Sequence, residues 1–247
     1  MLLLAPLIPH HYSDREVAQI EGRLYGLDPV LETFLDNPIP TFRANGIDDK
    51  GLRVTVLSNI AEGCVNLALS APEDEEYAVD CLDKVVKTAL SSSVSPYGGS
   101  PSHVSSLGNH GIYLSHLNVI LGAHKRLTGS NEYERLNRRI STHLASRSLQ
   151  DPYKHMRSYT SMQGRWPSDH AVTLYSLYLF DQNYDGSLSE KPIREWLEYM
   201  KTKGTDSDTG LPVSEVTGGW TYSKYPRGCA LSMTIRYMTA FTPEEAK

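Results

Sequence analysis

Residues 109–149 read NHGIYLSHLNVILGAHKRLTGSNEYERLNRRISTHLASRSL, and this stretch decides the fold class. Its first half is strongly apolar and ends at Gly129. In its second half Leu136, Ile140 and Leu144 recur every four residues. Residues four apart lie on one face of an α-helix, and glycine commonly follows the last residue of a helix. The stretch therefore predicts a helical hairpin, in which two helices are joined by a short turn.

The same pattern is found on both sides of this hairpin. Further helix pairs are predicted over about 52–90 and about 166–200, and another first helix starts near residue 225. The glycine breaks at Gly129 and Gly186 lie 57 residues apart by subtraction. A regular interval of this size is typical of helical-hairpin arrays, because one hairpin cannot bury its own apolar face and neighbours must stack.

The predicted architecture is all-α: a single domain over residues 1–247, built from helical-hairpin repeats that form a complete or partial (α/α) toroid. The first helix of each pair is the more apolar, and the second carries a charged stripe. That difference places first helices inside and second helices outside, although an open α-solenoid would show the same pattern. About four hairpins are visible, so the expectation includes a C-terminally incomplete chain or a ring completed by a second copy.

Composition narrows the range of functions. The formal net charge of −5 argues against a broad nucleic-acid-binding surface, which requires a basic face. No stretch is long and apolar enough to span a membrane. Three scattered cysteines without a CxxC pair predict neither a zinc site nor a disulfide framework, and they favour a reducing compartment such as the cytoplasm. No metal and no cofactor is predicted.

The residues able to carry chemistry lie on the predicted first helices, mostly near their starts. Asp169 opens one of them and is predicted as a general acid or base, although an acid at this position also simply offsets the helix dipole. His110, Tyr113 and His116 lie on a neighbouring first helix, where they predict a proton-transfer group that faces a cavity. The alternative is that these side chains are buried and hydrogen-bonded for structural reasons.

The entry loops supply candidate residues for binding a substrate. Long loops at one face of a scaffold are where sites usually lie, and here they are rich in aromatic and titratable residues. The predicted pocket-lining residues are Tyr159, Trp166, His170, Glu215, Trp220, Tyr225, Arg227 and Cys229. Fifteen tyrosines against four phenylalanines suit a cavity for a sugar or for an apolar molecule with one polar group, or plain packing between helices.

Four stretches carry a resemblance to a known family: HGIYLSHLN at 110–118, LTG at 127–129, WPSD at 166–169 and FTPEEA at 241–246. They resemble the six-hairpin (α/α) toroid enzymes, and within them the linalool dehydratase-isomerase-like branch. The resemblance implies a site in a central cavity at the loop-bearing ends of the inner helices, with His116 as the inner-helix histidine. The family's cysteine pair near the third inner helix has no counterpart here.

Two functions are compatible with these observations. The first is an enzyme that acts on a carbohydrate or terpenoid-like small molecule by acid–base chemistry, as a lyase, isomerase or hydrolase. The second is a non-catalytic helical-repeat scaffold that binds a peptide or protein on its concave face. The expected partner of the enzyme is a small-molecule substrate, and the sequence allows either a monomer or a homo-oligomer.

Overall fold

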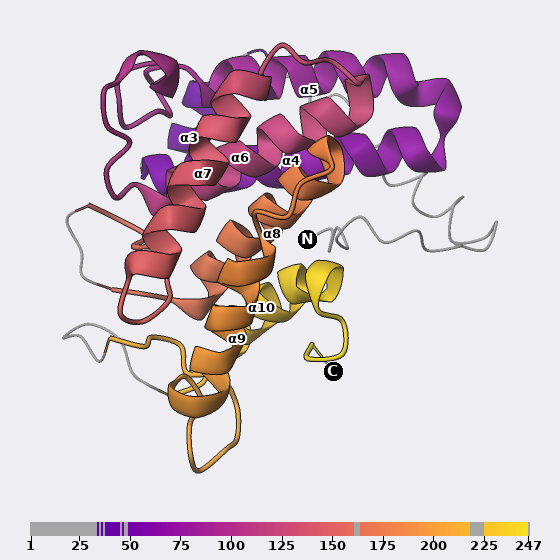
Figure 1. Cartoon of the computed structure of the whole chain (residues 1–247). Helices are drawn as coiled ribbons and strands as arrows, with labels where there is room; N and C mark the ends of the chain where they lie inside the picture. The colour runs from indigo at the N-terminus through magenta and orange to yellow at the C-terminus, as the bar shows by residue number, and fades with distance from the viewer. Residues whose placement is uncertain are drawn as a thin grey trace.

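The computed structural model describes residues 38–44, 49–160, 164–217 and 225–246, together with Phe34, Asp36 and Gly46. Within these ranges every regular element is a helix, as Figure 1 shows. The α-helices are α3 (Pro38–Ala44), α4 (Lys50–Ser70), α5 (Glu75–Ala89), α6 (Gly111–Thr128), α7 (Glu134–Gln150), α8 (Pro167–Tyr184), α9 (Glu190–Lys203) and α10 (Gly228–Phe241). Short 3₁₀ turns cover Pro72–Asp74 and Pro101–His103. The predicted all-α class is confirmed for the described part of the chain.

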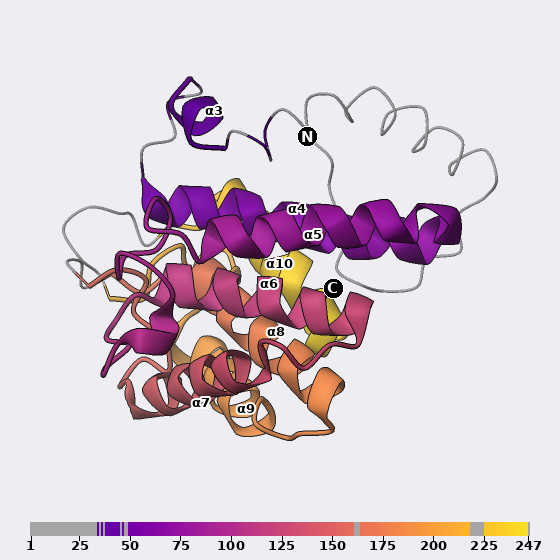
Figure 2. The ribbon, with the colours of Figure 1, turned by 90° about the horizontal axis from the view of Figure 1, so that it is seen from above.

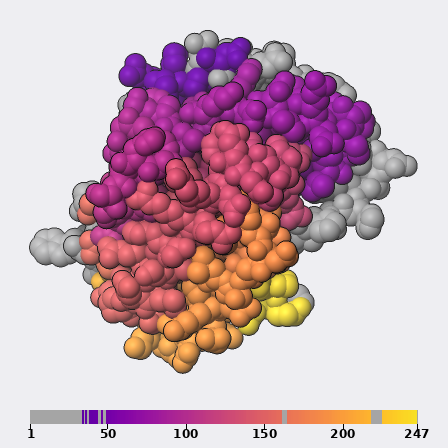
Figure 3. All heavy atoms as spheres, turned by 45° about the horizontal axis from the view of Figure 1, so that its top comes forward, coloured from indigo at the N-terminus to yellow at the C-terminus, as the bar shows by residue number. Residues whose placement is uncertain are grey.

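Four of the helices are neighbours in succession. Helix α4 packs on α6, α6 packs on α8, and α8 packs on α10. The other long helices lie beside this row: α5 contacts α4 and α6, α7 contacts α6 and α8, and α9 contacts α7 and α8. In Figure 2, α4 and α5 run along one edge of the molecule, and α7 and α9 lie at the opposite edge. Figure 3 shows the same progression on one surface, from indigo and purple through red to orange.

The burial pattern explains this order. Helices α6 and α8 are covered on nearly every side, because all of residues 113–124 and 170–177 lie in the interior. Helix α9 instead buries a single stripe made of Pro192, Trp196 and Met200. A helix buried all round belongs in a core, and a helix with one apolar stripe covers that core. Each large apolar side chain that is fully buried contributes roughly 1.5–3 kcal/mol to this packing.

A seam of polar side chains crosses the core between α6, α7 and α8. The Asn118 amide nitrogen donates to Ser141 Oγ at 2.9 Å and to Ser176 Oγ at 3.1 Å. Its amide oxygen accepts from Asn137 Nδ2 at 2.6 Å. Buried polar groups require such partners, so this network fixes how the three helices are aligned along their axes.

The helix ends follow local sequence signals. Asp49 caps α4, and its Oδ1 accepts the backbone N–H of Leu52 at 3.0 Å. Helix α6 ends at Thr128, and the next residue, Gly129, has a φ of 68° and donates its N–H to the Lys125 carbonyl. Glycine suits this left-handed conformation because it has no Cβ. The break between α6 and α7 therefore lies where the sequence predicted it.

No helix in the described ranges has both the length and the apolar character that crossing a membrane requires. The three cysteines are free thiols. Cys64 of α4 and Cys81 of α5 are buried with their sulfurs 3.0 Å apart, and Cys229 is exposed.

Candidate functional site

A short segment crosses the start of α6. Residues 155–160, called the strap here, place the carbonyls of Arg157 and Ser158 over the first turn of this helix. Arg157 O accepts the N–H of Gly111 at 3.1 Å, and Ser158 O accepts the N–H of Ile112 at 3.0 Å. The first N–H groups of a helix have no partner within the helix, so the strap supplies partners from outside.

The strap also reaches α8 and α4. The N–H of Met156 donates to Nδ1 of His170, in the first turn of α8, at 3.0 Å. The Tyr159 hydroxyl lies 3.4 Å from Oδ1 of Asp49, the capping residue of α4. The starts of α4, α6 and α8 therefore lie at one end of the molecule, which is called the entry end here.

Asp169 is half-buried in the first turn of α8, beside Ser158 of the strap. Burial raises the pKa of its carboxyl to about 6, although the Ser158 hydroxyl opposes that shift. A helix N-terminus normally favours a carboxylate, so desolvation outweighs the helix dipole here. A carboxyl with this pKa exchanges protons near neutral pH, which is the property required of a general acid or base.

His110 lies immediately before α6 and is half-buried. Its Nδ1 is 3.2 Å from the Thr160 hydroxyl oxygen, and burial lowers its pKa. Thr160 and Ser158 are two residues apart on the strap, so their Cα atoms are at most about 7 Å apart. His110 and Asp169 therefore approach the same short segment, one from α6 and the other from α8.

Two aromatic side chains lie at the same end. The rings of Tyr159 and Trp166 meet edge to face with their centroids 6.3 Å apart, and both residues are half-buried. Gly164 lies directly against the Trp166 ring, where a Cβ would come within 2.6 Å of it. Of these two predicted pocket-lining residues, Tyr159 belongs to the strap that contacts Asp169 and His110, and Trp166 packs against Tyr159.

His170 is held in a fully buried cluster rather than exposed to a substrate. Its ring lies 4.9 Å from that of His155 and 5.8 Å from that of Trp196. The Trp196 indole N–H donates to His155 Nε2 at 3.1 Å, so the His155 proton is on Nδ1, which donates to the Tyr153 carbonyl. Burial lowers the pKa of His155 to about 4 and that of His170 well below its ordinary value. Both rings are therefore neutral and anchor the strap.

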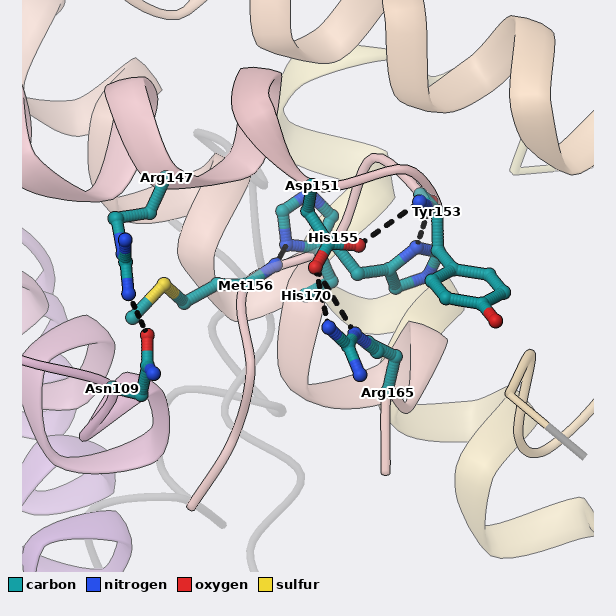
Figure 4. A network of polar contacts seen from close by, with 8 residues as sticks. All are labelled: Asn109, Arg147, Asp151, Tyr153, His155, Met156, Arg165 and His170. Atoms are coloured by element: carbon teal, nitrogen blue, oxygen red, sulfur yellow. Dashed lines mark hydrogen bonds and ion pairs between the residues drawn. The ribbon is translucent and has the colours of Figure 1, made fainter. Parts of the chain in front are cut away.

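A cleft of ≈ 210 Å³ lies next to this cluster, between the end of α7 and the strap. Figure 4 shows Arg147 and Asn109 on one side of Met156 and the Asp151–Arg165 pair on the other. Arg165 donates to Asp151 Oδ2 from Nη2 at 2.6 Å and from Nε at 3.1 Å. Of these residues, sequence reasoning grouped only Asn109 with His110 and did not connect it with the others, because 56 positions separate Asn109 from Arg165 and no local pattern joins them.

Tyr113 lies in the first turn of α6, and the Tyr97 ring contacts both Tyr113 and His110, but the Tyr113 hydroxyl is already engaged. The Tyr113 hydroxyl is buried and donates to the Ala89 carbonyl at the end of α5, at 2.9 Å. Its pKa is raised by burial, which fits a structural hydrogen bond. His116 is buried further along α6, near Arg236 of α10, and burial together with that charge lowers its pKa to about 3.

The surroundings of His116 form a second polar cluster, called the core cluster here. Arg236 of α10 forms an ion pair with Glu62 of α4, and Tyr175 of α8 lies beside the Glu62 carboxyl. Burial raises the pKa of Glu62 to about 7, although Arg236 opposes that shift. Within the described part of the chain, four buried atoms of this cluster have no hydrogen-bond partner: Glu62 Oε1, His116 Nδ1, Tyr175 OH and Arg236 Nε.

Sequence reasoning missed Glu62 and Arg236. The available signal was Glu62, the one acid in the predicted first helix at residues 52–69. A charge at such a position needs a buried partner, but the sequence does not indicate which helix supplies it.

Of the remaining predicted lining residues, those that the structure describes lie around the start of α10. Tyr225, Arg227 and Cys229 are exposed, and Ser214 Oγ donates to the Tyr225 carbonyl at 2.7 Å. Glu215 is buried, and its Oε1 accepts from the Thr217 hydroxyl at 2.6 Å. Trp220 lies outside the described residues. The loop before α10 is linked to the entry end, because Val216 N donates to the Arg165 carbonyl at 3.0 Å.

Among the described residues, no group of three or more His, Cys, Asp and Glu side chains is arranged to hold a metal ion. No protein-family model matches the chain, and no curated protein matches it. The class of site therefore follows from the geometry of the entry end alone.

Proposed function

We propose that this protein is an enzyme that transforms a carbohydrate or terpenoid-like small molecule by acid–base chemistry at the entry end. The observation that carries the proposal is the half-buried carboxyl of Asp169, whose pKa is raised to about 6. General acids and bases work best when their pKa is close to the working pH, and burial is the usual means of bringing a carboxyl there.

His110 is the second group in this proposal. Its lowered pKa keeps the imidazole neutral at pH 7, so that it accepts a proton. The Asp169 carboxyl would give its proton to a departing hydroxyl or glycosidic oxygen. His110 would take a proton from the neighbouring carbon, or from water. The first route is an elimination or isomerisation, and the second is a hydrolysis.

The class of substrate is suggested by the aromatic residues near this pair. Tyr159 and Trp166 offer apolar ring faces, and sugar rings and prenyl chains both pack on such faces. Hydroxyl groups on either kind of substrate would find the Thr160 side chain and the Asp169 carboxyl. Tyr113 is not assigned a direct role, because its buried hydroxyl already donates to the Ala89 carbonyl. His116 is not assigned one either, because it lies further along α6, near Arg236.

The arrangement of helices is part of the same proposal. We take α4, α6, α8 and α10 as the inner helices of a partial (α/α) toroid of the linalool dehydratase-isomerase-like kind, with α5, α7 and α9 as outer helices. This interpretation is supported by the succession of contacts along the inner row and by the common location of the starts of α4, α6 and α8.

The experiment is a substrate screen with matched variants. The full chain is incubated with a panel of glycosides and a panel of terpenols, and the Asp169→Asn variant is compared with Asp80→Asn, which changes an exposed acid on α5. We expect Asp169→Asn to lower turnover by about 10²-fold or more, as the loss of a general acid or base usually does, and Asp80→Asn to leave it unchanged.

The pH dependence provides a second readout. If Asp169 donates the proton, turnover falls as the pH rises through about 6, because the carboxyl loses its proton there. Full activity of Asp169→Asn, or no turnover of either panel by the native chain, would refute the proposal.

A further inference from the structure

The cleft beside the strap carries an excess of positive charge. Its lining includes three arginines, Arg147, Arg157 and Arg165, but Asp151 is the one acid among its lining residues. The excess is therefore two formal positive charges, in a protein whose overall formal charge is −5. His155, which also lines the cleft, stays neutral and adds no charge of its own at neutral pH.

The three arginines differ in whether an acid compensates their charge. Arg165 is buried, and its guanidinium is paired with Asp151, so its charge is compensated and its position is fixed. Arg147 is exposed and donates to the amide oxygen of Asn109, a neutral group that leaves the charge uncompensated. Arg157 is half-buried, and its guanidinium contacts no acid or hydrogen-bond acceptor among the described residues. Two of the three charges are thus available to a ligand.

We propose that this cleft binds the oxyanion group of a small molecule, a carboxylate or a phosphate, through Arg147 and Arg157. Guanidinium groups match both kinds of oxyanion because they present paired N–H donors in one plane. The Asp151–Arg165 pair holds one wall of the cleft, and the amide of Asn109 orients Arg147 toward the other. This site is independent of proton transfer at Asp169.

The size of the cleft limits the ligand. Pockets that enclose a whole drug-sized molecule have volumes of roughly 300–1,000 Å³. At ≈ 210 Å³ the cleft accommodates a small anion, or the charged end of a larger molecule whose remainder stays outside. A macromolecular polyanion is disfavoured, because its binding requires a broad basic face and the chain has a formal net charge of −5.

The test is a calorimetric titration of the full chain. Inorganic phosphate and citrate are titrated separately, with the ionic strength held constant by sodium chloride. The variants are Arg157→Gln and Arg147→Gln. The control is Arg135→Gln, which removes the same charge from an exposed position on α7, outside the cleft. Thermal unfolding without ligand establishes that each variant is folded.

We expect saturable binding of at least one of the two anions. Each cleft variant should bind it roughly tenfold more weakly, because a hydrogen bond to a charged group contributes on that scale. The control should bind as the native chain does. Binding of phosphate alone identifies a phosphate ligand, and binding of citrate alone identifies a carboxylate. The proposal is overturned if neither anion binds saturably, or if the cleft variants bind no more weakly than Arg135→Gln.

Discussion

Arg236 of α10 and Glu62 of α4 form an ion pair, with Nη2 and Oε2 2.7 Å apart, across 174 residues of sequence. The Glu62 side chain is almost fully buried, and that of Arg236 is 18% exposed. The Arg236 guanidinium also donates to the amide oxygen of Asn59 on α4. The ion pair thereby joins α10, the last described helix, to α4. Each charge compensates the other in a place where water hydrates them poorly.

The first prediction concerns the pH dependence of stability. The pKa of Glu62 is about 7 in the folded chain and 4.5 for the free group. A carboxyl with a raised folded pKa contributes its full stability below the unfolded value and loses it as pH rises through the folded value. Relative to Glu62→Gln, the native chain should therefore lose stability between pH 4.5 and 7, by on the order of 3 kcal/mol in all.

Urea unfolding of both proteins at several pH values measures this difference. Comparison with the variant is needed because buried histidines oppose the trend: their lowered pKa values cost stability as the pH falls. Glu76→Gln, at an exposed acid of α5, serves as the control and should follow the native pH profile. Parallel profiles for the native chain and Glu62→Gln would contradict the assigned pKa.

The second prediction concerns the Asp151–Arg165 pair. The two side chains are 11% and 9% exposed, so neither charge is well hydrated. Replacing Asp151 by Asn keeps the acceptor for the Tyr153 N–H but leaves Arg165 without its counter-charge. The free energy of unfolding should fall by about 3–5 kcal/mol, as it does when one partner of a buried pair is removed.

The matched control is Glu134→Gln. Glu134 forms an ion pair with Arg138 on the surface of α7, with side chains 36% and 55% exposed. Loss of such a pair should cost less than about 1 kcal/mol, because water and salt already screen it. Equal losses in the two variants, measured by urea unfolding, would show that burial of Asp151 contributes nothing.

The third prediction concerns the contact between the strap and α6. A Cβ added to Gly111 would lie 2.3 Å from the Arg157 carbonyl oxygen, a backbone atom that cannot rotate away. Gly111→Ala should therefore displace the strap and cost about 1–3 kcal/mol, as overpacking does. For a chain of this size that corresponds to a fall in the melting temperature of roughly 2–12 °C.

Gly228→Ala provides the comparison, because nothing lies within 4 Å of a Cβ added there. It is also at a helix start, and alanine favours a helix over glycine by roughly 0.5–1 kcal/mol. Its melting temperature should be unchanged or slightly higher. If Gly111→Ala melts no lower than Gly228→Ala, the strap does not pack tightly on α6.

Much of the secondary structure could be read from the sequence, because the signals that set it are local. The four-residue spacing of Leu136, Ile140 and Leu144 identifies the buried face of α7, and Gly129 and Pro167 mark helix ends. The placement of His110 and Asp169 at the starts of helices followed from the same signals. Each of these statements depends on residues within a few turns of one another.

Tertiary structure alone decided which polar groups meet and how each of them titrates. The pairing of Glu62 with Arg236, and the position of His116 near them, depend on how α4, α6 and α10 pack together. Likewise, the pKa of Asp169 is raised because the strap helps to bury its carboxyl, and the strap lies outside the local sequence of α8. Periodicity shows which face of a helix is buried, whereas desolvation and charge pairing depend on the neighbours that cover that face.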